Sequence, residues 1–269
     1  RLPAGVLLAL VVAGSAAAHA GPRVVDDGGA TLTLAAPARR IASLSPHATE
    51  LLFAAGAGDR IVATVAYADH PEAPRAIPRG GDAQRLDLER PIALRPHPAV
   101  VCTLEDIAAS IERLGRLAGT DSRAGEAAGA YRERLASLRR AQSGRPEVSV
   151  FFQVWRSPLL TLNGGQVIDD ALRLCGGRNV FAGERMLVPA VDLESVVKRD
   201  PDAIVASASG GEGGEALAAW RRLPGLRATA RGNLLALDSA ALARPSPGML
   251  DGVESLCARL DEARARGVR

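Results

Sequence analysis

The chain has 269 residues, enough for one large domain or two moderate ones with a sizeable core. Hydrophobic residues make up 47% of it but aromatic residues only 3%, so alanine, leucine and valine must form most of the core. The formal charge of +3 comes from 33 basic and 30 acidic residues. This near-balance, with no basic run interleaved with aromatic residues, gives no support for nucleic-acid binding.

The first twenty residues have the features of an export signal. Arg1 is followed by the apolar run Val6–Ala13, and small residues then lead to an A-x-A cleavage pattern that ends at Ala20. The apolar run is too short for a stable membrane anchor. Because no cysteine lies near the cleavage site, we do not expect a lipid-anchored lipoprotein. We therefore expect an exported, soluble protein whose signal peptide, residues 1–20, is cleaved after Ala20.

Short strands and helices alternate in the first part of the mature chain. Ser45 followed by Pro46 is a helix cap with its preferred first helical residue. The predicted elements are, in order, a hairpin (Val24–Leu34), a strand (Arg40–Ser43), a helix that runs through Ala55, a strand (Ile61–Val65), a proline-rich loop (Tyr67–Pro78) and a turn (Gly80–Gly81).

Two stretches 105 residues apart repeat one αβ unit. Asp87–Val101 reads DLERPIALRPHPAVV and Asp192–Ala206 reads DLESVVKRDPDAIVA, each with an acidic helix start, a proline and then a hydrophobic strand. An aspartate there can cap the helix, and a glutamate in the first turn suits the positive end of the helix dipole. A single D-L-E is only a good cap, but its repetition ahead of a matching strand favours two similar lobes.

Between the two copies the pattern becomes helical. Leu104–Ala118 has apolar residues at helical spacing and ends at Gly119. Asp121–Ala141 continues with few helix breakers for roughly 20 residues, a length of about 30 Å. This second helix is either a solvated surface helix or a rigid strut between lobes.

The second part of the chain repeats the first in outline. Its predicted strands are Val148–Val154, Ala203–Ser207 and Asn233–Leu237, and its predicted helices are Gln166–Leu174, Glu215–Arg222 and Gly248–Arg266. Alternating strands and helices imply an α/β fold with parallel sheets that are covered on both faces.

Sequence motifs for catalysis or metal binding are missing. There is no G-x-S-x-G or H-E-x-x-H motif, and the glycine clusters lack the spacing of nucleotide-binding loops. His47, His70 and His97 are unevenly spaced, so we expect no metal site, no cofactor and no enzymatic activity.

Export changes the interpretation of the three cysteines. Cys175 and Cys257 both lie in the second half and could pair in an oxidising compartment. Closing that loop would stabilise the fold by roughly 4–5 kcal/mol in the chain-entropy model. Cys102, at the end of an apolar strand, is expected to be a small buried hydrophobe.

Motifs from Arg40 to Leu260 resemble a known family. They include RIASLSPHATELLF, LCGGRNVF, VDLESVVKRDPDAIV and RPSPGMLDGVESLC, of which S-L-S-P-x-x-T-E-L and L-C-G-G-x-N-V-F are the most specific. In these motifs the chain resembles the periplasmic substrate-binding proteins with a helical hinge that serve ABC importers. Within that class it is similar to the cobalamin-binding members.

The resemblance implies two Rossmann-like lobes with parallel sheets, an N-terminal lobe over residues 21–120 and a C-terminal lobe over residues 143–269. One long helix, residues 121–142, would join them. The expected function is capture of cobalamin in the inter-lobe cleft, as a transported ligand, and delivery to an ABC transporter permease. Haem or a ferric siderophore is the alternative ligand. An exported α/β enzyme and a degenerate, non-binding member are less favoured alternatives.

The resemblance also implies ligand-binding residues and a disulfide. Tyr67 matches an aromatic residue that faces the corrin, Trp155 falls in the cleft loop of the second lobe, and Arg244 matches a polar cleft residue. A corrinoid is a large amphipathic disc, which aromatic faces and a few polar groups suit. Ordinary loop packing is the other interpretation of Tyr67 and Trp155. Cys175 and Cys257 match the disulfide of the family.

Docking to the transporter is implied in the same way. Glu89 and Glu194, one from each copy of the repeat, match the glutamates at the lobe tips that dock onto arginines of the permease dimer. The binding protein itself is expected to be a monomer.

The sequence departs from the family after the strand Ala99–Cys102. Relatives then have a cleft loop, a helix and a strand before a helix like Leu104–Ala118, whereas here Cys102 runs directly into that helix. The missing part amounts to roughly 20–30 residues by the usual size of such a unit. The N-terminal lobe is therefore expected to lack one helix, one strand and one wall of the ligand cleft.

Overall fold

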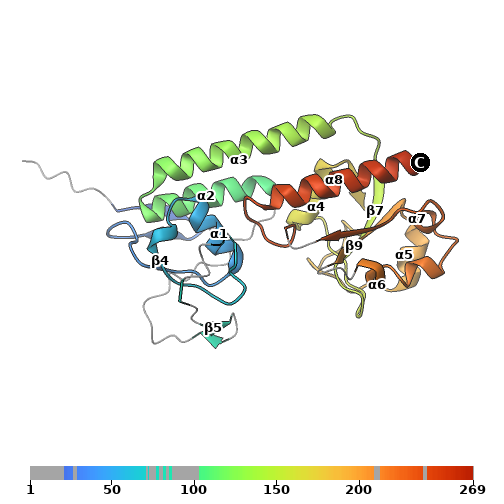
Figure 1. Cartoon of the computed structure of the whole chain (residues 1–269), viewed down its shortest axis with the longest axis horizontal. Helices are drawn as coiled ribbons and strands as arrows, with labels where there is room; N and C mark the ends of the chain where they lie inside the picture. The colour runs from blue at the N-terminus through green and yellow to red at the C-terminus, as the bar shows by residue number, and fades with distance from the viewer. Residues whose placement is uncertain are drawn as a thin grey trace, which may run out of the picture.

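The computed structural model describes residues 21–26, 29–70, 72, 77–78, 81–82, 85–86, 103–208, 213–238 and 241–268. The predicted signal peptide, the first copy of the repeat with Glu89 and His97, and Cys102 lie outside these ranges, so the expected loss of a helix and a strand there stays a prediction. We call the described residues before helix α3 the N-terminal lobe and those after it the C-terminal lobe (Figure 1).

The N-terminal lobe has short strands and two helices. Strands β1 (Arg23–Val25) and β2 (Thr31–Thr33) form the predicted antiparallel hairpin. Strands β3 (Ile41–Ala42) and β4 (Ile61–Ala63) pair in parallel, and α1 (Pro46–Ala54) and the 3₁₀ turn η1 (Gly58–Arg60) connect them. The remaining elements are the antiparallel strands β5 (Gly81–Asp82) and β6 (Arg85–Leu86) and helix α2 (Leu104–Ala118).

The ends of α2 show how closely local sequence sets its limits. Thr103 and Asp106 form a capping box, in which each side chain accepts a hydrogen bond from the backbone N–H of the other residue, at 2.7 and 3.3 Å. Gly119 ends the helix with φ 65°, a left-handed conformation that glycine adopts without a steric penalty. The predicted helix over these residues is confirmed.

Helix α3 (Asp121–Gln142) is the longest element, 22 residues or about 33 Å. Its buried residues recur at helical spacing on one face: Ala124, Ala128, Tyr131 and Leu135. It contacts α1 and α2 in the N-terminal lobe and α4 and α8 in the C-terminal lobe, and Figure 1 shows it running along both. The helix is thus solvated on one face and packed against both lobes on the other.

The C-terminal lobe is built on a four-stranded parallel sheet in the order β10-β9-β7-β8. Its strands are β7 (Val148–Gln153), β8 (Gly177–Asn179), β9 (Ala203–Ala208) and β10 (Leu234–Asp238). Its helices are α4 (Val167–Leu174), α5 (Leu193–Arg199), α6 (Gly213–Ala216), α7 (Arg227–Ala230) and α8 (Met249–Arg266), with a 3₁₀ turn η3 (Trp220–Arg222).

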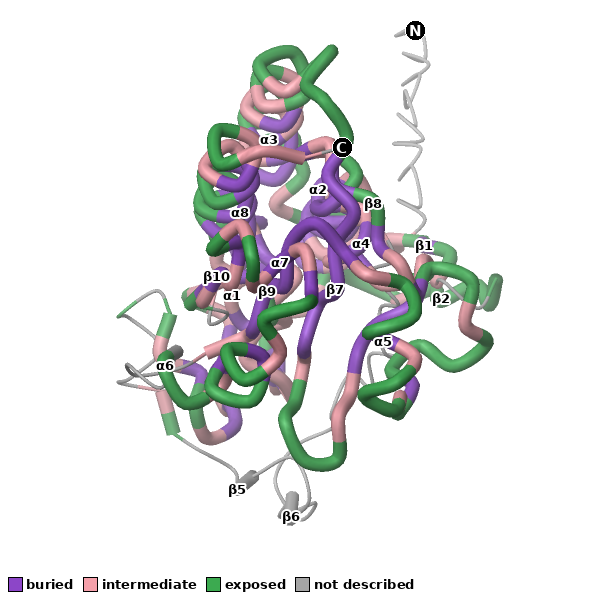
Figure 2. The backbone as a smooth tube through the Cα atoms, turned by 90° about the vertical axis from the view of Figure 1, so that its right-hand side faces the viewer, coloured by how far each residue is buried: buried purple, intermediate pink, exposed green. Residues whose placement is uncertain are grey.

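Both faces of this sheet are covered, as predicted. Val150 and Phe152 of β7 pack in one cluster with residues of α3, α4 and α8, whereas Phe151 packs on the other face with Phe181 and Trp220. Figure 2 shows β7 and β9 as largely buried strands inside the lobe. All six residues of β7 are buried, the pattern expected of a central parallel strand.

The second copy of the repeat folds as predicted. The Asp192 carboxylate accepts a hydrogen bond from the Ser195 N–H at 2.6 Å and so caps α5. Hydrogen bonding to the Ser195 side chain, and then to its backbone N–H, lowers the pKa of Asp192. Asp200 ends the helix in the left-handed region, with φ 41°, and β9 begins three residues later.

Two details of the C-terminal lobe differ from the prediction. The single helix expected over Glu215–Arg222 is wrong, because the chain forms α6 and η3 with a turn between them. Strand β8 and helix α7 were not predicted, since each is only three or four residues long and gives too little periodicity to detect.

The predicted disulfide between Cys175 and Cys257 is confirmed. It ties the end of α4 to the middle of α8 inside the main hydrophobic cluster. Close by, the Asn179 side chain donates to the Leu162 carbonyl and accepts from the Phe181 N–H, both at 2.9 Å. The L-C-G-G-x-N-V-F motif therefore supplies a disulfide cysteine, the glycines of the turn into edge strand β8, and the Asn179 amide that fixes the loop after β8.

No helix among the described residues is both long and apolar enough to span a bilayer.

Candidate ligand-binding and docking site

A buried hydroxyl network fixes the start of α1. The Thr49 hydroxyl lies 2.7 Å from Ser43 Oγ and 2.9 Å from Thr64 Oγ1, and all three side chains are buried. Ser45 caps the helix by accepting from the Ala48 N–H at 3.3 Å. The S-L-S-P-x-x-T-E-L motif thus ties α1 to the carboxyl ends of β3 and β4, the end of a parallel sheet where ligands bind.

Glu50, the next residue of that motif, reaches across to the other lobe. Its Oε1 lies 2.9 Å from Arg244 Nε, and its Oε2 accepts a hydrogen bond from Ser246 Oγ. Arg244 and Ser246 lie between β10 and α8, on the carboxyl side of β10. The loops at the carboxyl ends of strands in the two lobes therefore meet at this carboxylate.

A second polar contact joins the lobes near α3. Asp170 of α4 accepts a hydrogen bond from the Leu104 N–H at 2.9 Å, so a C-terminal-lobe carboxylate meets the first residue of α2. A carboxylate is favoured there by the positive end of the helix dipole. Among the described residues, the contacts of Glu50 and of Asp170 therefore connect the lobes in addition to α3.

The pKa of His47, in the first turn of α1, departs from its ordinary value. Burial lowers the pKa of His47 below 6.5, and the negative charge of Glu50 opposes that shift. The ring Nε2 lies 3.5 Å from Ser45 Oγ. At neutral pH the imidazole beside Glu50 is therefore uncharged.

We expect His47 to make the protein less stable as the pH falls below about 6.5. The unfolded chain then binds a proton that the native imidazole resists until the pH reaches its lower pKa, so stability rises with pH in this window. Urea unfolding at a series of pH values should show a smaller acid loss for His47→Gln than for the unchanged protein. Equal pH dependence of the two proteins would contradict this assignment.

Tyr67 and Trp155 are both strongly exposed, at 79% and 62%. Tyr67 has φ 66°, an unusual conformation for a non-glycine residue, and the Trp155 indole donates to the Ser157 carbonyl at 3.0 Å. Within the described residues no hydrogen bond, ion pair or ring contact joins either side chain to Arg244. Each exposed ring presents a flat apolar face to solvent.

A loop that the sequence interpretation missed adds apolar surface to the C-terminal lobe. Met186, Leu187 and Val188 are exposed at 68%, 50% and 38%. Leu160 bridges to both Trp155 and Ala190, so it lies between the tryptophan and the chain that follows this loop. The run M-L-V in a polar surrounding was a signal for it, but the sequence did not show that the run would lie outside the core.

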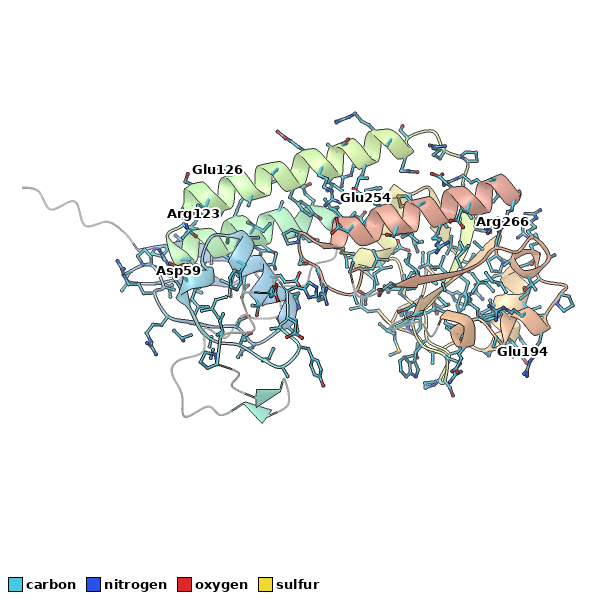
Figure 3. All side chains as sticks on the ribbon, in the orientation of Figure 1. Asp59, Arg123, Glu126, Glu194, Glu254 and Arg266 are labelled. Atoms are coloured by element: carbon cyan, nitrogen blue, oxygen red, sulfur yellow. A yellow bond between two sulfur atoms is a disulfide. The ribbon has the colours of Figure 1, made fainter. Side chains whose placement is uncertain are left out.

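Glu194 lies in the first turn of α5 on the side of the C-terminal lobe opposite α3 and α8 (Figure 3). It is exposed, and so are its neighbours Leu193 and Val197. No group of three side chains that could hold a metal ion occurs in the described part of the chain.

Glu50 and Ser246 are the polar residues of this region that the sequence did not identify. Ser246 is 1% exposed, and 196 residues separate it from Glu50. No local pattern connects positions that far apart, so only the fold reveals their contact with Arg244.

Curated relatives cover most of the chain. The vitamin B12-binding protein of Vibrio cholerae serotype O1 is 31% identical over 253 residues, 85% of this chain and 91% of the relative. The protein of the same name from Vibrio parahaemolyticus is 30% identical over 263 residues, 88% of this chain and 94% of that protein. No protein-family model matches the chain.

The length of the first alignment bears on the expected missing unit. It runs over 253 residues, whereas 85% of 269 residues is about 229, which is 24 fewer. Within the aligned region the relative thus has roughly two dozen residues that face gaps in this chain. That number agrees with the size of one helix and one strand.

Solved structures give the same grouping. The periplasmic vitamin B12 binding protein BtuF of Vibrio cholerae superposes with a TM-score of 0.74 and 31% identity, over 85% of this chain and 98% of that protein. The periplasmic heme binding protein HutB of Vibrio cholerae has a TM-score of 0.68 at 20% identity, over 83% and 99% of the two chains, and shares the fold alone. From its sequence and its fold, the chain belongs to the family of the vitamin B12-binding proteins.

Proposed function

We propose that this protein captures a corrinoid, with cobalamin as the expected ligand, and delivers it to the permease of an ABC importer. The observation that carries the proposal is the similarity to vitamin B12-binding proteins over 85% of the chain at 31% identity. We infer two lobes, residues 21–120 and 143–269, that the helix over residues 121–142 joins. The ligand is then transported rather than used as a cofactor, and the protein is not an enzyme.

Tyr67, Trp155 and Arg244 are our candidates for ligand contacts. The two exposed rings offer flat apolar faces, one from each lobe, that could lie against a corrin. Arg244 offers hydrogen-bond donors to the amide oxygens at the rim of a corrinoid. The exposed Met186–Val188 loop would offer further apolar surface on the C-terminal-lobe side.

For delivery we propose that Glu89 and Glu194 contact arginines of a permease dimer. Glu194 is exposed on the side away from α3 and α8, so the long helices would not separate it from a partner surface (Figure 3). Strands β5 and β6 lie on that same side of the N-terminal lobe in Figure 1, and β6 ends three residues before Glu89 in sequence. Charge pairing of this kind orients the complex more than it tightens it.

The site of action follows from the same proposal. The relative of known structure is a periplasmic protein, and we propose that residues 1–20 direct this chain to the periplasm and are removed after Ala20. There the mature protein would act as a monomer, in a compartment that maintains its disulfide.

The proposal is tested by equilibrium dialysis of the purified protein against cyanocobalamin, haem and a ferric siderophore in separate experiments. We expect retention of cyanocobalamin at one molecule per chain and no comparable retention of the other two. Retention of haem but not of cyanocobalamin would show that haem, the alternative ligand, is the ligand of this protein. Retention of none of the three would make it a non-binding member of the family.

A further inference from the structure

The ion pair of Glu50 with Arg244, next to Ser246, is shielded from solvent between the two lobes. The Glu50 side chain is 11% exposed and that of Arg244 29%, so the ion pair is shielded from solvent much more than the surface pairs of α8, such as that of Arg259 with Glu262, at 47% and 41%. A shielded pair is screened less by salt and holds its geometry better than an exposed one.

The two carboxylate oxygens of Glu50 have different partners. Oε1 lies beside Arg244 Nε, and Oε2 accepts from the buried Ser246 hydroxyl. The Nε–H does not point at an acceptor with hydrogen-bond geometry, so the contact is an ion pair rather than a directed hydrogen bond. The serine fixes the carboxylate, and the carboxylate holds the inner side of the guanidinium by charge.

The outer side of the same guanidinium remains available. Within the described residues, neither terminal amino group of Arg244 forms a hydrogen bond or an ion pair with another side chain. A guanidinium presents five N–H donors in a rigid fork, and four of them belong to these two groups. An oxygen acceptor of a ligand can therefore approach them without displacing Glu50.

We propose that Glu50 is a positioning residue, which together with Ser246 forms an inter-lobe clasp on Arg244. The clasp fixes the N-terminal lobe against the C-terminal lobe in addition to the Asp170–Leu104 contact, and it aims the terminal amino groups of Arg244 at the bound ligand. The contact between the lobes concerns the protein without ligand, whereas the orientation of Arg244 toward a ligand rests on the proposed function.

The clasp is tested by distances between spin labels in the ligand-free protein. Labels are attached to Asp59→Cys in the N-terminal lobe and Lys198→Cys in the C-terminal lobe, both exposed positions, in a Cys102→Ser background. We expect a narrow distance distribution that broadens on Glu50→Gln, because the amide keeps the shape of the side chain but loses its charge. Glu112→Gln is the matched control, since it weakens an ion pair of α2 with Arg132 of α3 and not a contact between the two lobes, and it should leave the distribution unchanged.

The positioning role is tested by a double-mutant cycle on cyanocobalamin binding. Glu50→Gln should weaken binding by about tenfold, close to 1.4 kcal/mol, in the unchanged protein and by much less in Arg244→Met, because the two residues act as one unit. Equal losses in both backgrounds would overturn the positioning role, and unchanged label distances would overturn the clasp itself. If the distances respond while the unchanged protein fails to bind cyanocobalamin, the clasp stands and the proposed ligand is wrong.

Discussion

Replacing Glu89 and Glu194 together by arginine is expected to abolish ligand transport while leaving ligand binding intact. Each substitution would turn an attraction to a permease arginine into a repulsion, and like charges that face each other in an interface cost several kcal/mol. Neither glutamate belongs to the proposed ligand contacts, so cyanocobalamin affinity should change little. The measurement is ligand-stimulated uptake in cells that depend on this binding protein and its own permease.

A matched control separates docking from the effect of net charge. Glu126 and Glu133 are exposed on the solvent face of α3, on the side of the molecule away from Glu194, and Figure 3 shows Glu126 and Glu194 in these positions. Glu126→Arg with Glu133→Arg makes the same change in charge and should leave uptake near its normal rate. Normal uptake by the Glu89→Arg and Glu194→Arg protein, or equal loss in the control, would contradict docking through these carboxylates.

Loss of the disulfide is expected to lower the free energy of unfolding by about 2–5 kcal/mol. The bond closes a loop with a sequence separation of 82 residues and lies within the main hydrophobic cluster, between α4 and α8. Its removal frees the unfolded chain and loosens the face of the sheet that α8 covers. Urea unfolding of Cys175→Ala with Cys257→Ala, beside the unchanged protein under oxidising conditions, measures the difference.

Reductant supplies the control for that experiment. Adding it should destabilise the unchanged protein by a similar amount and should have no effect on the doubly substituted protein. A difference well below 1 kcal/mol between the two proteins, or equal sensitivity to reductant, would show that the disulfide is not a main source of stability.

Local sequence predicted those elements whose ends carry their own signals. The capping box at Thr103 and the left-handed Gly119 set the limits of α2, and Asp192 does the same for α5, all within a few residues of chain. The alternation of buried strands with helices was likewise enough to predict a parallel sheet that is covered on both faces.

Features that depend on contacts between residues far apart in the sequence could not be predicted from local sequence. Strand β8 is three residues long and exists because it pairs with β7, and the segment expected as one helix after Gly214 is split in two, with Trp220 of η3 packed on Phe151. The contact of Glu50 with Ser246 joins residues 196 positions apart. The resemblance to a family pointed to Arg244, but only the three-dimensional fold pairs it with Glu50.

The central claim is that two joined lobes hold one corrinoid, and isothermal titration of the purified, disulfide-bonded protein with cyanocobalamin tests it most directly. We predict saturation at one ligand per chain and a clearly weaker isotherm for Trp155→Ala, which removes an exposed aromatic face. The absence of heat with cyanocobalamin, in a preparation that binds haem with the same stoichiometry, would contradict the account.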